Sequence, residues 1–420
     1  MPVLRAPRRP SPIAPRVVAS RRVLGSVLDR PLTSFHLVVG LLAVLSGLGL
    51  VMVLASSSVD SFTRTGNPYG TFEHQLVYCL VGLGLFGVAL TVPPRRLRAW
   101  SPWLVVGSLV ALLAVLVPGL GSSVAGAQKW FVVGGVSLQP SEPAKLALVL
   151  WGAHVLVARG RSLHRWRSAL LPLVPVALVV AALVVVQPDL GSAICIVIVL
   201  FALLWFAGVP TRLIGLLGAG AMGSVALLAV SASYRMARLT SFLSPDAGDP
   251  LGPGYQEREA MFSLADGGLL GAGLGQGSAQ WSYLPNASND FVFAVVGEQL
   301  GFVGATAVLG LFGVLAYTGL RIAARTADPW TRIVVATLTV WLVAQAAINV
   351  GYVLGLLPVT GITLPLVSSG GSSVVVTMGS LGLLAAAARD EPEARVALAS
   401  RPARGARWPW RVGVRVPSGR

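Results

Sequence analysis

Two carboxylates stand at the start of one long apolar run, in the segment YLPNASNDFVFAVVGE, residues 283–298. Asp290 opens the run, and Glu298 follows deeper, about 80° further round a helix. A charge is costly inside an apolar span, so such residues predict function by default. A general base must be accessible to a hydroxyl, which Asp290 satisfies better than Glu298. The alternative for Asp290 is a helix cap, since Ser288 and Asn289 lead into the same helix start.

A second pair of charges lies in the segment LQPSEPAK, residues 138–145. Glu142 and Lys145 share a helix face, and unpaired charges are costly at membrane depth, so we expect an ion pair beside a polar cavity. The segment VQPDLGS, residues 186–192, has a similar design, with Asp189 directly after a proline. For both segments the simpler interpretation is a good helix start, because proline and an acid both favour the first turn.

Two glycine-containing segments also border apolar runs. LPVTGITLPLVSSGGSS, residues 357–373, breaks its helix and supplies hydroxyls such as Ser368 and Ser372, so it predicts the lining of a cavity. GGLLGAGLGQG, residues 267–277, has neither the Lys-Ser/Thr of a phosphate loop nor the spacing of a dinucleotide-binding turn. Its glycines instead predict tight turns and a close approach to a helix or a ligand.

The elements that position these residues belong in a membrane. Of 420 residues, 55% are hydrophobic and only 11% charged, and the mean hydropathy is +0.76. A span needs about 20 apolar residues, and we expect an all-α polytopic membrane protein with ten such transmembrane helices. Their predicted starts are His36, Gln75, Pro102, Ser141, Ala169, Gly191, Pro210, Phe291, Trp330 and Ser372.

Arginine clusters set the expected orientation. They precede the first predicted span and follow the second and the fourth, whereas the alternate loops 57–74 and 121–140 hold one basic residue each. Since cytoplasmic loops carry the excess of Lys and Arg, we expect both termini in the cytoplasm and a long extracellular loop, 231–289, between helices 7 and 8. The composition of the tails favours disorder or contact with anionic lipid. The predicted parts are a cytoplasmic Arg/Pro-rich tail 1–33, a membrane domain 34–389 and a cytoplasmic Arg-rich tail 390–420.

Several function classes are disfavoured by the same residues. The formal net charge of +16 could suggest nucleic acid, but the basic residues lie in short clusters between apolar runs and form no nucleic-acid module. The four histidines show no HExxH spacing. Cys79 and Cys195 lie in apolar runs, which predicts buried packing rather than a disulfide or a metal cluster.

Six segments, in order, resemble the SEDS family, which includes FtsW, RodA and the sporulation homologue. They are AGAQKWFVVGGVSLQPSEPAKLALVL, QPDLGSA, FLSPDAGDPLGPGYQ, GGLLGAGLGQGSAQ, LPNASNDFVFAVVGEQLGFVG and NVGYVLGLLPVTGITLPLVSSGGSS. The similarity runs from about Pro31 to Arg389, and the opening segment looks closer to the division branch, FtsW, than to the elongation branch, RodA.

The resemblance implies a peptidoglycan glycosyltransferase that joins lipid II units into glycan strands on the outer face of the bacterial cytoplasmic membrane, at the division septum. The family's catalytic aspartate matches Asp290, which would deprotonate the acceptor 4-hydroxyl as undecaprenyl pyrophosphate leaves. The implied partners are a class B penicillin-binding protein, other division proteins and membrane lipid. No cofactor is implied with certainty, although a divalent cation could take part.

Cations and hydroxyls around Asp290 would then bind the substrate, because positive charge stabilises a pyrophosphate leaving group. Arg238 and Lys145 rank first among the cations. The full set of candidate substrate-binding residues is Lys129, Lys145, Glu142, Arg235, Arg238, Gln256, Glu298, Ser368 and Ser372.

The chain also departs from the family pattern. Ser288-Asn289 stands where the family commonly has His-Thr, and Glu298-Gln299 where it has Glu-Glu, so no role for a histidine or a second glutamate transfers. A lipid II flippase is the main alternative, since broken helices and intramembrane charges also suit transport. A non-enzymatic division scaffold is compatible with either activity.

Overall fold

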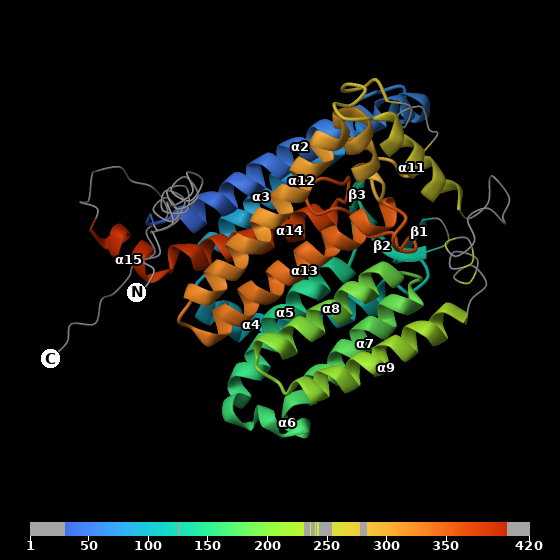
Figure 1. Ribbon diagram of the computed structural model, residues 1–420. Coiled ribbons are helices and arrows are strands. Elements are labelled where there is room, and N and C mark those ends of the chain that lie inside the picture. Colours follow the sequence, from blue (N-terminus) through green and yellow to red (C-terminus); the bar gives the residue numbers. More distant parts are fainter. Residues whose placement is uncertain are drawn as a thin grey trace, which may run out of the picture.

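The computed structural model describes residues 30–124, 127–230, 254–277 and 284–400, together with Met236, Thr240 and Phe242. Most of this part of the chain is helical, and the long helices run roughly side by side in one bundle (Figure 1). Within these described residues, six helices are long and apolar enough to cross a membrane: α2 (Thr33–Thr65), α3 (Gly70–Thr91), α4 (Pro94–Ala114), α12 (Val292–Arg325), α13 (Pro329–Val353) and α14 (Ser372–Arg389).

Further helices lie beside these six or cap their ends. Those in the bundle are α5 (Ser141–Arg159), α7 (Leu173–Val186), α8 (Leu190–Phe206) and α9 (Thr211–Val230). The short ones are η1 (Gly160–His164), α6 (Trp166–Leu170), α11 (Tyr255–Asp266) and α15 (Pro392–Ala399).

The start of α4 departs most from its prediction, at Pro94 instead of Pro102. A proline suits the first helical turn, but the arginines that follow it lower the hydropathy there, so a hydropathy window begins the span too late.

The centre of the bundle is formed by α13 and α14. In their most apolar stretches 72% and 78% of residues are buried, against 17% in α3, so α3 lies at the periphery. Small residues let α14 approach α3 closely: Gly82 faces the side chain of Met378, and Gly382 faces Ala89. Close contact of this kind replaces the hydrophobic effect between helices in lipid. Cys79 and Cys195 are buried free thiols, which confirms the predicted packing role.

The glycine-rich loop 267–277 packs backbone to backbone against α12. Ala272 N donates to the carbonyl of Glu298 at 2.9 Å, and Phe302 N donates to the carbonyl of Gly268 at 2.9 Å. Between these bonds, Gly301 leaves helical geometry, with φ 67° and ψ −169°. A kink of this kind leaves helical groups without their usual partners, and the loop satisfies several of them. The predicted close approach of these glycines to a helix is therefore confirmed.

A small antiparallel sheet, β1 (Ser122–Val124), β2 (Ala127–Val133) and β3 (Val136–Leu138), was missed by the all-α prediction. The turn between β2 and β3 is Gly134-Gly135, with φ of 58° and 82°. Two consecutive residues with positive φ form the turn that suits a hairpin, and glycine adopts it without strain. The sequence VVGGV carried this signal, but the segment lies between two apolar spans and was treated as a loop.

The two ends of the bundle differ. One end carries the sheet and α11, whereas α6 and α15 lie away from it (Figure 1). The prediction of a disordered tail is wrong for the part that the structure describes, since α15 lies within 390–400. Arg325, at the end of α12, pairs with Glu393 at 2.5 Å and lies 3.7 Å from Glu391, so ion pairs hold α15 in place.

Candidate functional site

Asp290 lies in the turn that leads into α12 and is partly buried. The N-cap residue of this helix is Phe291, so Asp290 is not the capping residue that the simpler interpretation expected. The carboxylate lies against Gly361, which has φ +70°: a Cβ built on that glycine would stand 3.5 Å from Asp290 Oδ2. Asp290 therefore faces the loop between α13 and α14, residues 354–371, which we call the 354–371 loop.

Main-chain contacts join the Asp290 turn to this loop. Ser369 N donates to the carbonyl of Ser288 at 2.8 Å. The carbonyl of Asp290 itself accepts from Asn349 Nδ2 and Tyr352 Oη, each at 2.8 Å. Both donors lie on α13, a helix for which the sequence motifs predict no site residue.

Glu142 and Lys145 form the predicted ion pair on α5. Lys145 Nζ lies 2.8 Å from Glu142 Oε1, and the two side chains are only 2% and 7% exposed. The ammonium also lies 5.0 Å from the centre of the Trp341 ring on α13, close enough for a cation–π contact. The pair is thus closed off from solvent and held by its neighbours.

A second charged centre forms around Asp189. Its carboxylate caps α8 by accepting from Ser192 N at 3.1 Å, as the helix-start interpretation predicted. It also accepts from Gln139 Nε2 at 2.6 Å, and Lys129 Nζ lies 3.6 Å away. Lys129 keeps 23% of its side chain exposed, so this cation remains accessible.

The two candidate serines have different surroundings. Ser372 Oγ accepts from Gln139 N at 2.9 Å, which connects the start of α14 to the Asp189 centre. Ser368 is fully buried, and its hydroxyl accepts from Leu364 N at 2.8 Å within the 354–371 loop. In this arrangement Ser368 supports the loop, whereas Ser372 lies beside the charged residues.

The remaining candidates fall in several places. Glu298 is buried in the first part of α12, where a Cβ on Gly277 would stand 2.6 Å from its carboxyl carbon, so a larger residue at 277 would require the Glu298 carboxylate to move. Gln256 is partly buried on α11. Arg235 and Arg238 lie outside the described residues.

Three contributors escaped the sequence reasoning: the role of Asp189 as a partner of Lys129, and the side chains of Asn349 and Tyr352. Asp189 was treated only as a helix start. Asn349 and Tyr352 stand three residues apart in an apolar span, and polar residues in such a span were a usable signal.

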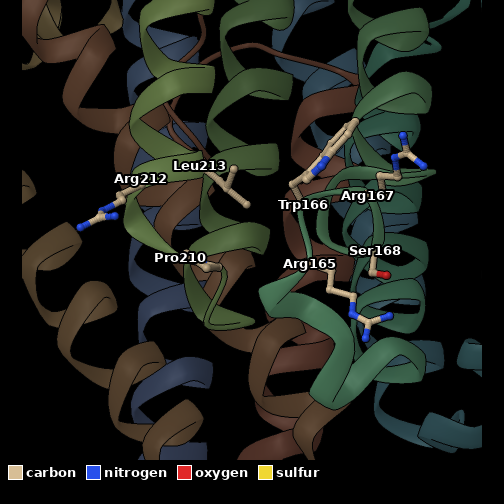
Figure 2. A pocket seen from close by; sticks show the side chains of 7 residues that line it. All are labelled: Arg165, Trp166, Arg167, Ser168, Pro210, Arg212 and Leu213. Carbon is tan, nitrogen blue, oxygen red and sulfur yellow. The ribbon is translucent and has the colours of Figure 1, made fainter.

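A surface pocket elsewhere holds none of the candidate residues. It lies between α6 and the start of α9, has a volume of about 630 Å³ and is lined mainly by Arg165, Trp166, Arg167, Arg212 and Leu213. The three arginine side chains turn in different directions around it (Figure 2). They do not converge on one point, so this pocket is not built as an anion clamp.

Comparison with known proteins decides the family. A family model of cell cycle proteins, FtsW/RodA/SpoVE, matches residues 35–393. The chain belongs to the FtsW/RodA/SpoVE family. Together with its apolar helices, this membership makes it a multi-pass membrane protein.

Two named members of this family show how similar the chain is to individual proteins. The chain is 50% identical over 380 residues to the probable peptidoglycan glycosyltransferase FtsW of Mycobacterium tuberculosis, covering 90% of this chain and 72% of that protein. It is 35% identical over 337 residues to the stage V sporulation protein E of Bacillus subtilis, covering 80% of this chain and 92% of that protein.

Solved structures share the fold. One chain of a peptidoglycan synthase complex that coordinates polymerization and crosslinking matches with a TM-score of 0.70 and 33% identity, covering 84% of this chain and 97% of that one. The rod shape determining protein RodA of Thermus thermophilus matches with a TM-score of 0.61 and 30% identity, covering 84% and 96%.

Proposed function

We propose that this protein is a peptidoglycan glycosyltransferase that polymerises lipid II on the outer face of the cytoplasmic membrane during cell division. The naming of relatives up to 50% identical supports the activity, and their FtsW naming supports a septal location. The observation that carries the proposal is the position of Asp290, which is partly buried, joined through its main chain to α13, and directed at Gly361.

In the proposed reaction Asp290 is the general base. It takes the proton of the acceptor sugar's 4-hydroxyl as that oxygen attacks the anomeric carbon of the donor, and the bond from that carbon to the pyrophosphate oxygen breaks. The attack inverts the anomeric centre, and the leaving undecaprenyl pyrophosphate carries the electron pair away. A positioned base of this kind contributes about 10²–10⁴-fold to a rate.

Lys129 is the better of the two described lysines for the leaving pyrophosphate. Its side chain is 23% exposed and its contact with Asp189 is long, at 3.6 Å, so it can reach an incoming anion. Lys145 is almost fully enclosed and already paired with Glu142 at 2.8 Å. This reverses the order expected from the sequence, in which Lys145 ranked above Lys129.

The proposed topology has ten transmembrane helices with both termini in the cytoplasm. The six long apolar helices supply six spans, and α5, α7, α8 and α9 supply the other four. The alternation of arginine clusters along the chain supports this arrangement. It puts Asp290 and the sheet outside, where lipid-linked sugars are polymerised, and assigns loop 231–289 to the same side of the membrane.

The proposed partner is a class B penicillin-binding protein, with other division proteins. The support is the similarity to a chain of a complex that coordinates polymerization and crosslinking. A glycan strand is crosslinked as it is made, so a polymerase and a transpeptidase held together would act on one product.

Lipid II polymerisation by the purified chain, with and without its transpeptidase partner, tests this function. We expect glycan strands that migrate as a ladder on a gel. A flippase is the second candidate, because α12 is broken at Gly301 and the Glu142–Lys145 pair lies deep in the bundle, features that also suit transport. Lipid II movement across liposomes without any polymer, in either preparation, would favour the flippase.

A further inference from the structure

A stripe of polar side chains runs along one face of α13. It consists of Trp341, Gln345, Asn349 and Tyr352. Spacings of four, four and three residues keep these side chains within one helical face, and each is at most 2% exposed. Buried polar groups in a span are costly unless they are hydrogen-bonded, so their partners indicate what they hold.

The partners of the stripe lie at the two ends of the candidate site. Trp341 is the ring beside Lys145, and its Nε1 donates to Gln345 Oε1 at 3.0 Å. Gln345 in turn donates from Nε2 to the carbonyl of Thr363 in the 354–371 loop, also at 3.0 Å. The stripe thus begins at the Glu142–Lys145 pair and continues into the loop that faces Asp290.

At the outer end, two main-chain carbonyls converge on Asn349 and Tyr352. The carbonyl of Asp290 lies 2.8 Å from both Asn349 Nδ2 and Tyr352 Oη. The carbonyl of Ile362 lies 2.7 Å from the first and 2.6 Å from the second. Two carbonyl oxygens aimed at one place repel each other, so donors must hold them there.

The number of donor protons on Asn349 and Tyr352 matches the number of acceptor oxygens. The amide of Asn349 offers two N–H groups and the phenol of Tyr352 offers one O–H, which makes three donors for two carbonyls and the phenol oxygen. The amide nitrogen must face the carbonyls, because its oxygen would add a third repelling acceptor; Asn349 Oδ1 is indeed buried with no hydrogen-bond partner. Tyr352 also packs edge-on against Phe291, with ring centres 5.7 Å apart.

We propose that Asn349 and Tyr352 are positioning residues that clamp the Asp290 main chain to the 354–371 loop and thereby fix the carboxylate relative to the acceptor sugar. This inference rests on the proposed function for its effect on the rate, but the clamp itself is a property of the fold. Its two carbonyls belong to segments 72 residues apart, Asp290 and Ile362, so contacts between distant segments must hold them together; the clamp supplies these at the carbonyls, and the bond from Ser369 N to Ser288 O lies beside it.

Three variants of α13 test the clamp. Asn349→Leu removes two of the three protons, and we expect glycan polymerisation to fall about a hundredfold, the usual effect of misplacing a reacting group by about 1 Å. Tyr352→Phe removes one proton but keeps the ring against Phe291, and we expect a fall of about tenfold. The matched control is Thr339→Val, another buried polar residue of α13, whose hydroxyl bonds only within its own helix, to Val335 O at 2.8 Å; we expect its rate unchanged.

Two measurements distinguish a specific effect on the position of Asp290 from a general loss of folding. The KM for lipid II should stay within about twofold of the wild-type value in Tyr352→Phe while kcat falls, because the lost contact acts on the base and not on binding. Hydrogen exchange should rise together in the peptides that cover 284–291 and 354–371 in both clamp variants and in neither peptide of Thr339→Val.

Each outcome decides the proposal. Polymerisation by Asn349→Leu and Tyr352→Phe at the wild-type rate would overturn the clamp while leaving the glycosyltransferase function intact. Unchanged hydrogen exchange in both peptides would overturn it as well. If the wild-type chain makes no glycan, the proposed function fails, and the exchange measurement alone then decides whether the clamp exists. Because Tyr352→Phe keeps the shape of the core, the test survives a failure of Asn349→Leu to fold.

Discussion

Two charged sites among the described residues, the Glu142–Lys145 pair and Asp290, differ in character. The Glu142–Lys145 pair is dry and closed, with a 2.8 Å contact and side chains no more than 7% exposed. Asp290 is partly buried at the mouth of α12, and its position is set through its backbone carbonyl rather than by enclosing its carboxylate. A buried pair of this kind has a structural role, because Lys145 on α5 also contacts the Trp341 ring on α13. A carboxylate whose main chain is held by hydrogen bonds keeps a defined position, which is what a general base requires.

The largest expected effect comes from breaking the closed pair on one side. Lys145→Met leaves the Glu142 carboxylate buried without its partner, which costs about 3–5 kcal/mol of folding free energy. Replacing both residues, as Glu142→Gln with Lys145→Met, should recover most of that loss, because no uncompensated charge remains. Thermal unfolding of the purified protein in detergent measures both. Equal stability of the single and double variants would show that the pair is not the closed structural unit described above.

The next effect concerns the main-chain hydrogen bonds between loop 267–277 and α12 around Gly301. Gly301→Ala places a Cβ at φ 67° and against the amide of Gly271, so we expect a loss of roughly 2 kcal/mol or more. Gly310→Ala is the matched control, because that glycine lies in open space on the same helix. The control should gain up to about 1 kcal/mol from better helix propensity. Similar unfolding temperatures for the two variants would show that the close packing of loop 267–277 against Gly301 does not contribute to stability.

A smaller effect is expected at the accessible cation. Lys129→Gln should lower lipid II turnover about tenfold, or about 1.4 kcal/mol of transition-state stabilisation, while the unfolding temperature stays close to wild type. Arg64→Gln is the control, since Arg64 is the only other basic residue in the two short loops predicted to lie outside, and its side chain is 75% exposed. A loss that is equal in both variants would mean that net charge, and not Lys129, sets the rate.

The smallest effect is expected for an exposed ion pair, whose contribution to stability can be compared with that of the buried Glu142–Lys145 pair. Glu393→Gln removes the contact with Arg325 that helps to hold α15. Arg325 is 29% exposed and Glu393 55%, so solvent screens the pair, and we expect less than about 1 kcal/mol. A loss of unfolding free energy as large as that of Lys145→Met would show that the buried and the exposed ion pair contribute equally to stability.

The sequence predicted well what depends on neighbours along the chain. Apolar runs located the long helices, and the spacing of Glu142 and Lys145 predicted their contact, because residues three apart meet on a helix without any tertiary information. The capping interpretation of Asp290 failed by one residue, since a predicted start at Phe291 makes Asp290 the N-cap, whereas α12 starts at Val292 and its N-cap is Phe291. The pattern of apolar residues does not fix the end of a helix to the residue, because helix ends fray over one or two residues.

Contacts between distant segments could not be predicted in this way. Lys129 and Asp189 are 60 residues apart, and Asn349 lies 59 residues from Asp290. Each pair meets only because elements that are distant in the sequence pack together, and neither composition nor periodicity predicts which elements do so. The β2–β3 hairpin is a different case, since its Gly134-Gly135 turn was visible in the sequence but was masked by the strong apolar runs around it.

The most direct test of the account is the turnover of Asp290→Asn. The amide keeps the shape and the main-chain carbonyl that Asn349 and Tyr352 hold, but it cannot take a proton from the acceptor hydroxyl. We expect a protein that folds, keeps its unfolding temperature and binds lipid II, yet polymerises it at least about a hundredfold more slowly. Ser288→Ala, two residues away, should retain activity. Glycan formed by Asp290→Asn at the wild-type rate would contradict the central claim that Asp290 is the base.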